Sequence, residues 1–118
     1  MRYFLILLMS LTASFASAPA RAETAYDFSL PNITGGELNL ADYRGKAVLL
    51  VNTASFCGFT KQYDGLQALW DGYRARGLIV LGVPSNDFGS QEPGAKAEIK
   101  EFCEVNFAIN FPMSDKVA

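Results

Sequence analysis

The sequence of 118 residues contains no histidine, and it has only two cysteines and one tryptophan. Without histidine, the chain cannot form the Cys-His or Ser-His pairs that activate many enzyme nucleophiles. A zinc site would need two thiolates plus carboxylates, which is an uncommon ligand set. We therefore expect no metal and no cofactor. This leaves the two cysteines, Cys57 and Cys103, as the residues whose chemistry has to be weighed.

The sequence also lacks an apolar run long enough to span a bilayer comfortably. Its start instead follows the layout of a secretory signal peptide: a basic residue at Arg2, an apolar run, and small residues ending in Ala-Pro-Ala-Arg-Ala. We predict a signal peptide over residues 1–22, cleaved after Ala22, with cleavage after Ala18 as the alternative. Residues 23–118 would then form one small domain, periplasmic or secreted, without stable membrane association.

Positive charge is scarce in this chain. It has 10 Lys and Arg residues against 12 Asp and Glu residues. Removal of residues 1–22 takes away Arg2 and Arg21, which leaves eight basic residues and a net charge near −4. No basic stripe is present. Because proteins that bind nucleic acid depend on positive charge for much of their affinity, we expect no nucleic-acid partner.

The stretch VLLVNTASFCGFT, residues 48–60, organises the rest of the chain. Its first four residues predict a buried strand, and Cys57 follows a polar turn just before a helical pattern. A thiol at a helix N-terminus faces unpaired N–H groups and the positive end of the helix dipole, so its thiolate should form more readily. Lys61 and the Thr60 hydroxyl could add to this effect. The alternative is a cysteine that packs as a small hydrophobic side chain.

The pattern around Cys57 predicts a strand, a helix and a second strand in an α/β fold. Residues 63–76 place apolar side chains at helical spacing, Gly77 follows as a stop, and residues 78–83 form another apolar run of strand length. This order implies a right-handed crossover between parallel strands. Reactive groups collect at the carboxyl ends of such strands, so the loop over residues 84–94 is expected beside Cys57. Taken alone, the loop is equally an ordinary solvated connection.

Further elements flank this unit. Residues 26–40 alternate apolar and polar side chains around Gly35-Gly36 and predict a β-hairpin. Residues 95–106 predict a helix with Cys103 on its apolar stripe, where a packed side chain is the default interpretation. The two cysteines of an exported chain could also form one structural disulfide. The sequence enters a new element near residues 111–113 and then stops, so we expect an unpaired strand edge and a chain that is cut short.

The segment VNTASFCGFTKQYDGLQALWDGYRARGLIVLGVPSNDFGSQEPG resembles the core of the glutathione peroxidase family, in the version that has cysteine where some members have selenocysteine. The resemblance runs from about residue 26 to residue 117. It implies a thioredoxin-like fold and the reduction of hydrogen peroxide and organic hydroperoxides, with glutathione or a thioredoxin-like protein as reductant. Cys57 matches the peroxidatic position in NxAxxCGxT, Gln91 the active-site glutamine in FGxQEP, and Cys103 the resolving cysteine in FCxxxF.

The sequence departs from the family pattern in three places. A Trp-Asn-Phe segment, which carries the family's remaining active-site residues, is expected after Met113 and is absent. We therefore expect the C-terminal strands and helix of the fold to be missing. Asp87 stands where a glutamine is more usual, which alters polarity near the site, and Ser85 stands where many members have a further cysteine.

The resemblance implies a mechanism in which the Cys57 thiolate attacks a peroxide and becomes a sulfenic acid, with Gln91 holding the thiolate and polarising the peroxide. Cys103 then condenses with the sulfenic acid, and an external dithiol reopens the disulfide. Because bridging requires Cα atoms within about 7 Å, the helix of Cys103 must loosen locally. Two alternatives stay open. One is a thioredoxin-type thiol–disulfide oxidoreductase, which Thr60 at the fourth position of Cys-x-x-Cys disfavours. The other is an inactive fragment with a structural disulfide.

Overall fold

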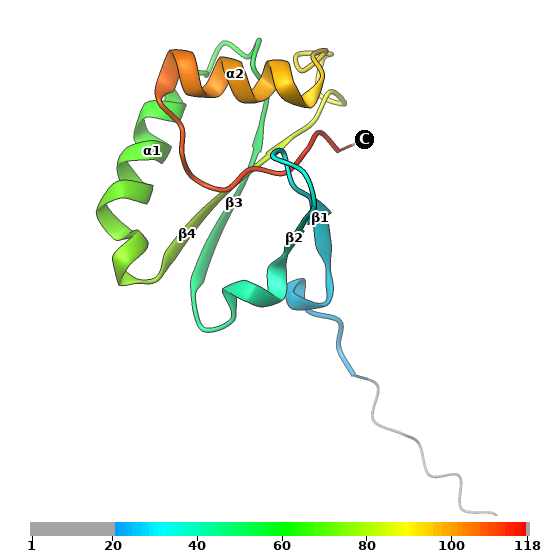
Figure 1. Cartoon of the computed structure of the whole chain (residues 1–118), viewed down its shortest axis with the longest axis vertical. Coiled ribbons are helices and arrows are strands. Elements are labelled where there is room, and N and C mark those ends of the chain that lie inside the picture. The colour runs from blue at the N-terminus through cyan, green and yellow to red at the C-terminus, as the bar shows by residue number, and fades with distance from the viewer. Residues whose placement is uncertain (1–20, 118) are drawn as a thin grey trace, which may run out of the picture.

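The computed structural model of the chain describes residues 21–117, so the predicted signal peptide lies almost wholly outside the described residues. Two short strands are followed by an alternation of longer strands and helices (Figure 1). The strands and helices are β1 (Ser29–Pro31), β2 (Glu37–Asn39), β3 (Ala47–Thr53), α1 (Gln62–Tyr73), β4 (Leu78–Pro84) and α2 (Lys96–Phe107), with 3₁₀ turns at Ala25–Asp27, Leu40–Tyr43 and Arg74–Arg76.

The first two strands form the predicted β-hairpin. They pair antiparallel, with Leu30 opposite Leu38. Gly35 and Gly36 close the turn with φ angles of +98° and +76°, a left-handed region that favours glycine because it has no Cβ. The Asn32 side chain also accepts the N–H of Thr34 at 3.0 Å, as is usual for asparagine in turns.

The predicted strand, helix, strand unit is confirmed. Strands β3 and β4 pair parallel, from Ala47 opposite Leu78 to Thr53 opposite Pro84, and α1 crosses between them. The region after α1 ends at Gly77, whose φ of +93° lets the chain reverse into β4. Both strands therefore end at the same edge of the sheet, where Cys57 and the loop over residues 84–94 follow them.

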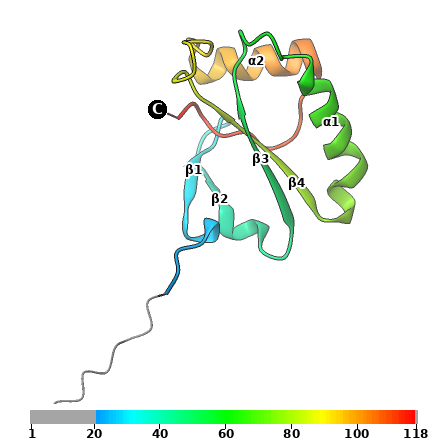
Figure 2. The ribbon, with the colours of Figure 1, turned by 180° about the vertical axis from the view of Figure 1, so that it is seen from behind.

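The new element expected near residues 111–113 is an extended segment that adds to this sheet, a pairing that the sequence did not predict. Residues 112–117 run beside β4: Gly82 forms a parallel bridge with Met113, and Ser85 forms one with Val117. The same segment also bridges to the hairpin, because Asn32 pairs antiparallel with Ser114. It therefore joins β4 to the hairpin, as the ribbon seen from behind shows (Figure 2).

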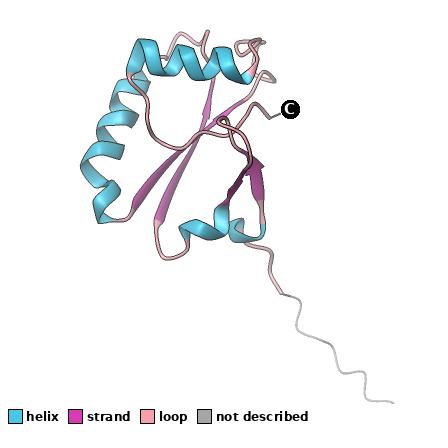
Figure 3. Ribbon diagram, in the orientation of Figure 1, coloured by secondary structure: helices cyan, strands magenta, loops and turns pink. Residues whose placement is uncertain are grey.

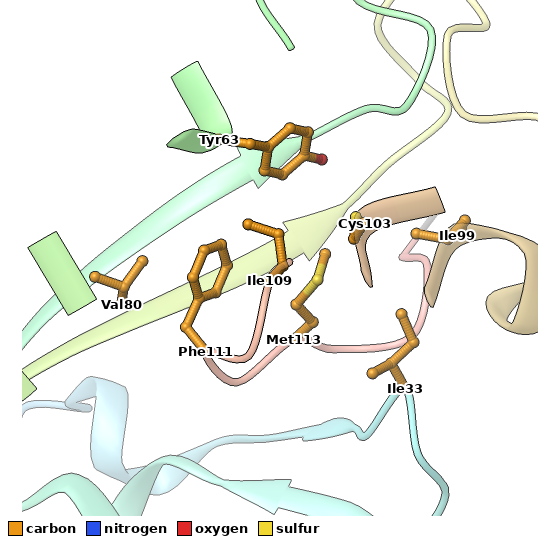
Figure 4. Close-up of a cluster of buried hydrophobic side chains, with 8 residues drawn as sticks. All are labelled: Ile33, Tyr63, Val80, Ile99, Cys103, Ile109, Phe111 and Met113. Carbon is orange, nitrogen blue, oxygen red and sulfur yellow. The ribbon is translucent and has the colours of Figure 1, made fainter. Parts of the chain in front are cut away.

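Strand β4 lies at the centre of the packing, with helices and hairpin around it (Figure 3). Its alternate residues belong to two buried clusters, because successive side chains of a strand point to opposite faces. One cluster joins the helices to β4 and the C-terminal segment (Figure 4), and the other joins β4 to the hairpin. The first contains Ile33, Tyr63, Val80, Ile99, Cys103, Ile109, Phe111 and Met113; the second contains Leu38, Leu40, Ile79, Leu81 and Val83.

The prediction of a buried β3 is wrong. Val48, Leu49 and Leu50 are 39%, 38% and 52% exposed, although their sequence is as apolar as that of β4. The reason is position in the sheet: β4 has a neighbour on each side, whereas β3 pairs with β4 alone within residues 21–117. The unpaired strand edge expected from the sequence is therefore that of β3. In the same part of the chain, no helix combines the length and hydrophobicity needed to cross a membrane.

Candidate active site

Cys57 lies in a turn between β3 and α1, with its side chain half-buried. The backbone N–H of Phe59 points at the sulfur, with 3.4 Å between nitrogen and Sγ. Helix α1 begins only at Gln62, so the prediction that the thiol lies directly at a helix N-terminus is wrong. The N–H of Thr60 bonds to the carbonyl oxygen of Cys57 at 3.3 Å. The N–H group that faces the sulfur thus belongs to Phe59 in the turn before α1, and not to the first turn of the helix.

The loop over residues 84–94 lies against this turn, as predicted. The backbone N–H of Phe56 donates to the carbonyl oxygen of Gln91 at 3.0 Å, which places Gln91 beside the residue that precedes Cys57. The Gln91 side chain is half-buried and makes no hydrogen bond to Cys57 within the described residues. Its role in holding the thiolate therefore stays a prediction.

Glu92 is a residue at the site that the sequence interpretation missed. Its side chain is 0% exposed, and its Oε2 accepts the N–H of Ser55 at 2.8 Å. Burial raises the pKa of the Glu92 carboxyl, while the Ser55 hydroxyl and N–H and the charge of Lys116 oppose this rise. Glu92 is part of the FGxQEP motif, but a glutamate in a stretch rich in Gly, Ser and Pro is typical of a solvated loop, so the motif did not indicate its burial.

Cys103 lies on α2 with 1% of its surface exposed, inside the buried cluster of Figure 4. Burial raises the pKa of its thiol to about 11, and the influence of the Tyr63 hydroxyl partly opposes this rise. The packed position predicted from its apolar stripe is confirmed. Both cysteines are free thiols in this structure, so a permanent disulfide is not what holds α2 in place.

The structure nevertheless brings the two cysteine-bearing segments into contact. The rings of Phe56 and Phe102, each the residue before a cysteine, stack with centroids 6.4 Å apart. A cleft of about 440 Å³ lies at this contact and is lined by Ser55, Glu92 and residues of α2. The turn that carries Cys57 and the helix that carries Cys103 are therefore neighbours across this cleft.

This arrangement is suited to thiol chemistry. A half-exposed sulfur with an N–H donor is accessible for thiol chemistry, and the backbone carbonyl of Gln91 lies beside the turn that carries it. Within residues 21–117, no group of three or more His, Cys, Asp or Glu side chains is placed to hold a metal ion.

Known proteins resemble this chain over most of its length. The family model for glutathione peroxidase matches residues 25–118. The hydroperoxy fatty acid reductase gpx1 of Synechocystis is 52% identical over 94 residues, which are 80% of this chain and 56% of that protein. A glutathione peroxidase of Lactococcus lactis is 46% identical over 92 residues, 78% of this chain and 59% of the relative. The chain thus spans less than two thirds of the length of these relatives.

Solved structures show the same relationship. The crystal structure of Trgpx in its apo form is 35% identical, with a TM-score of 0.59 over 82% of this chain and 56% of that one. A thioredoxin family thiol:disulfide interchange protein from Chlorobium tepidum, 20% identical, superposes with a TM-score of 0.63 over 86% of this chain and 64% of its own. The thioredoxin-like fold is therefore confirmed, and the chain belongs to the glutathione peroxidase family.

Proposed function

We propose that the chain belongs to a thiol-dependent peroxidase that reduces hydrogen peroxide and organic hydroperoxides through Cys57. The observation that carries this proposal is the placement of Cys57 at the carboxyl end of β3, half-exposed and with the Phe59 N–H directed at its sulfur. Family membership supports the same chemistry. The Synechocystis relative is named a hydroperoxy fatty acid reductase, which supports organic hydroperoxides as one substrate class.

The reaction proceeds in three balanced steps. The Cys57 thiolate attacks the terminal oxygen of ROOH, so that a sulfur–oxygen bond forms, the oxygen–oxygen bond breaks, and RO⁻ leaves and is protonated to ROH. The Cys103 thiolate then attacks the sulfenic sulfur, which forms the disulfide and releases hydroxide, protonated to water. Two glutathione thiols, or the dithiol of a thioredoxin-like protein, finally reduce the disulfide by two successive exchanges, which restores both Cys57 and Cys103 thiols and leaves the reductant as a disulfide.

Exposed aromatic rings support access for organic peroxides. Phe56 and Phe59, which flank Cys57 in the sequence, are 68% and 71% exposed. Apolar surface of this kind can bind the hydrocarbon part of a hydroperoxide by removing it from water. Gln91 is proposed to hydrogen-bond the peroxide through its side-chain amide.

The resolving step requires α2 to open. Cys103 is 1% exposed and packed in a buried cluster, whereas disulfide bonding needs its sulfur to meet that of Cys57. Local opening of a helix is a known route to such contacts. The stack of Phe56 on Phe102 keeps the two segments adjacent, so that opening need not carry Cys103 far from its target.

The proposal is tested by adding one equivalent of hydrogen peroxide to the reduced chain and mapping its cysteines by mass spectrometry. We expect a Cys57–Cys103 disulfide, and a sulfenic acid at Cys57 in a Cys103→Ser variant. Peroxide consumption that continues at the original rate in Cys57→Ser would refute the proposal. Insulin reduction without peroxide turnover would favour the thioredoxin-type alternative, which Thr60 disfavours.

We also propose that the protein is exported, with a signal peptide over residues 1–22. The support is the sequence pattern of a basic start, an apolar run and small residues before Ala22. Expression of the whole chain in a bacterial host followed by N-terminal sequencing of the periplasmic product tests this. We expect Glu23 as the first residue, and an intact Met1 in a cytoplasmic product would refute export.

A further inference from the structure

The Glu92 side chain combines full burial with a direct contact to the turn that carries Cys57. Carboxylates are almost never fully buried without a paired charge. Within residues 21–117, however, no Lys or Arg forms an ion pair with this one. Its Oε1 has no hydrogen-bond partner in that part of the chain, and its Oε2 accepts the Ser55 N–H at 2.8 Å. The bond to Ser55 is therefore the main polar contact of this carboxyl.

That bond is one of two that fix successive peptide units just before Cys57. The Ser55 N–H is held by the side chain of Glu92, and the Phe56 N–H is held by the carbonyl oxygen of Gln91 at 3.0 Å. The next donor in the turn, the N–H of Phe59, faces the Cys57 sulfur at 3.4 Å. The direction of this donor depends on the path of the turn, so it depends on the two bonds that anchor the start of the turn.

Glu92 is itself held in place from both sides. Its N–H donates to the Asn86 side-chain oxygen at 2.9 Å. The Lys116 ammonium donates to the carbonyl oxygens of Glu92 and Gly94, at 3.2 and 2.8 Å. Because its backbone is anchored in this way, the carboxyl acts as a fixed acceptor and resists movement of Ser55.

We propose that Glu92 is a positioning residue for Cys57, acting through its hydrogen bond to Ser55; this inference rests on the proposed peroxidase function. The acceptor oxygen keeps the turn in the conformation in which the Phe59 N–H faces the sulfur. The effect comes from the acceptor and does not require the negative charge. Without the acceptor, the buried Ser55 N–H is left unpaired, the turn shifts to satisfy it, and the sulfur loses its donor.

Three variants in a Cys103→Ser background test this. Glu92→Met keeps the volume and removes the acceptor, whereas Glu92→Gln keeps an amide oxygen that can accept from Ser55. Glu98→Met is the control, because Glu98 lines the same cleft but, among the residues that the structure describes, accepts only the N–H of Ala95, at the start of α2. Two rates are measured at Cys57 for each folded variant: alkylation by iodoacetamide, which needs no peroxide, and single-turnover oxidation by hydrogen peroxide.

Glu92→Met is expected to slow both reactions by about tenfold. This is the effect expected when the Cys57 thiolate loses its hydrogen bond from the Phe59 N–H. Glu92→Gln and Glu98→Met are expected to retain both rates within about threefold. Wild-type rates in a folded Glu92→Met, or equal losses in the Gln and Met variants, would overturn the inference. If Glu92→Met does not fold, hydrogen exchange at the Ser55 amide is measured in Glu92→Gln. Fast exchange there, with unchanged alkylation and oxidation rates at Cys57, also overturns the inference. A parent chain that is alkylated at Cys57 but not oxidised by peroxide refutes the proposed function alone.

Discussion

Opening of α2 should control how fast the two cysteines join, and a pair of substitutions at Val105 isolates that step. Val105 is 76% exposed on α2, two residues beyond the buried Cys103, so its side chain contributes little to the core. Glycine disfavours a helix interior by about 1 kcal/mol relative to alanine. Replacing Val105 by each in turn therefore changes the free energy of opening α2 by about 1 kcal/mol, while neither variant adds a new side-chain contact.

An opening equilibrium shifted by about 1 kcal/mol changes the open population about fivefold. We therefore expect the Cys57–Cys103 disulfide to form about fivefold faster in Val105→Gly than in Val105→Ala, if opening is a rapid equilibrium before the sulfurs react. Formation of the Cys57 sulfenic acid should be the same in both variants, because it does not involve α2. Rapid mixing with one equivalent of hydrogen peroxide, acid quenching and mass analysis resolve the two steps. Equal disulfide rates in two variants whose unfolding free energies differ as expected would refute opening of α2 as the route.

Two further predictions concern stability. Because burial raises the pKa of Cys103 to about 11 from its ordinary value of 9.0, its contribution to folding is complete below pH 9 and is lost as the pH rises towards 11. Chemical denaturation across this range should show wild type losing about 2 to 3 kcal/mol more than Cys103→Ala, and parallel curves would contradict this. Gln67→Met should destabilise the fold by about 1 kcal/mol, because Gln67 bonds both the side chain and the N–H of Asn110, at 2.7 and 3.0 Å. Gln62→Met is the control for Gln67→Met, because Gln62 is exposed. Equal melting temperatures of the two variants would contradict this prediction.

Local signals in the sequence were sufficient for most of the secondary structure. The Gly35-Gly36 turn, the helical spacing after Cys57 and the stop at Gly77 each depend on residues within a few positions of one another, and each matches the structure. Burial could not be predicted in the same way. The runs over residues 48–51 and 78–83 are equally apolar, yet only the second is buried, because burial depends on which strands lie on either side.

The candidate site shows the same division. The sequence placed Cys57 after a strand and placed Gln91 in the facing loop, because parallel strands bring their carboxyl ends to one edge. It did not indicate that Glu92 is buried, since the partner of its carboxyl is a backbone N–H that lies 37 positions earlier. Every residue except proline has a backbone N–H, so the residue type does not show which N–H donates to a buried carboxyl. Such contacts cannot be predicted from residue types.

The surroundings of Cys57 are in this way fixed by segments that are far apart in the sequence. The C-terminal segment bridges to β4 through Met113, and Lys116 in that segment donates to the carbonyl oxygens of the loop that holds Gln91 and Glu92. That loop in turn holds the N–H groups of the turn before Cys57. A change that loosens residues 112–117 therefore weakens the contacts that hold the loop, and through the loop the turn that carries Cys57. The reactivity of Cys57 should consequently fall when residues 112–117 become less ordered, although no hydrogen bond joins them to Cys57 within the described residues. A thiol reagent reports that dependence without any need for peroxide.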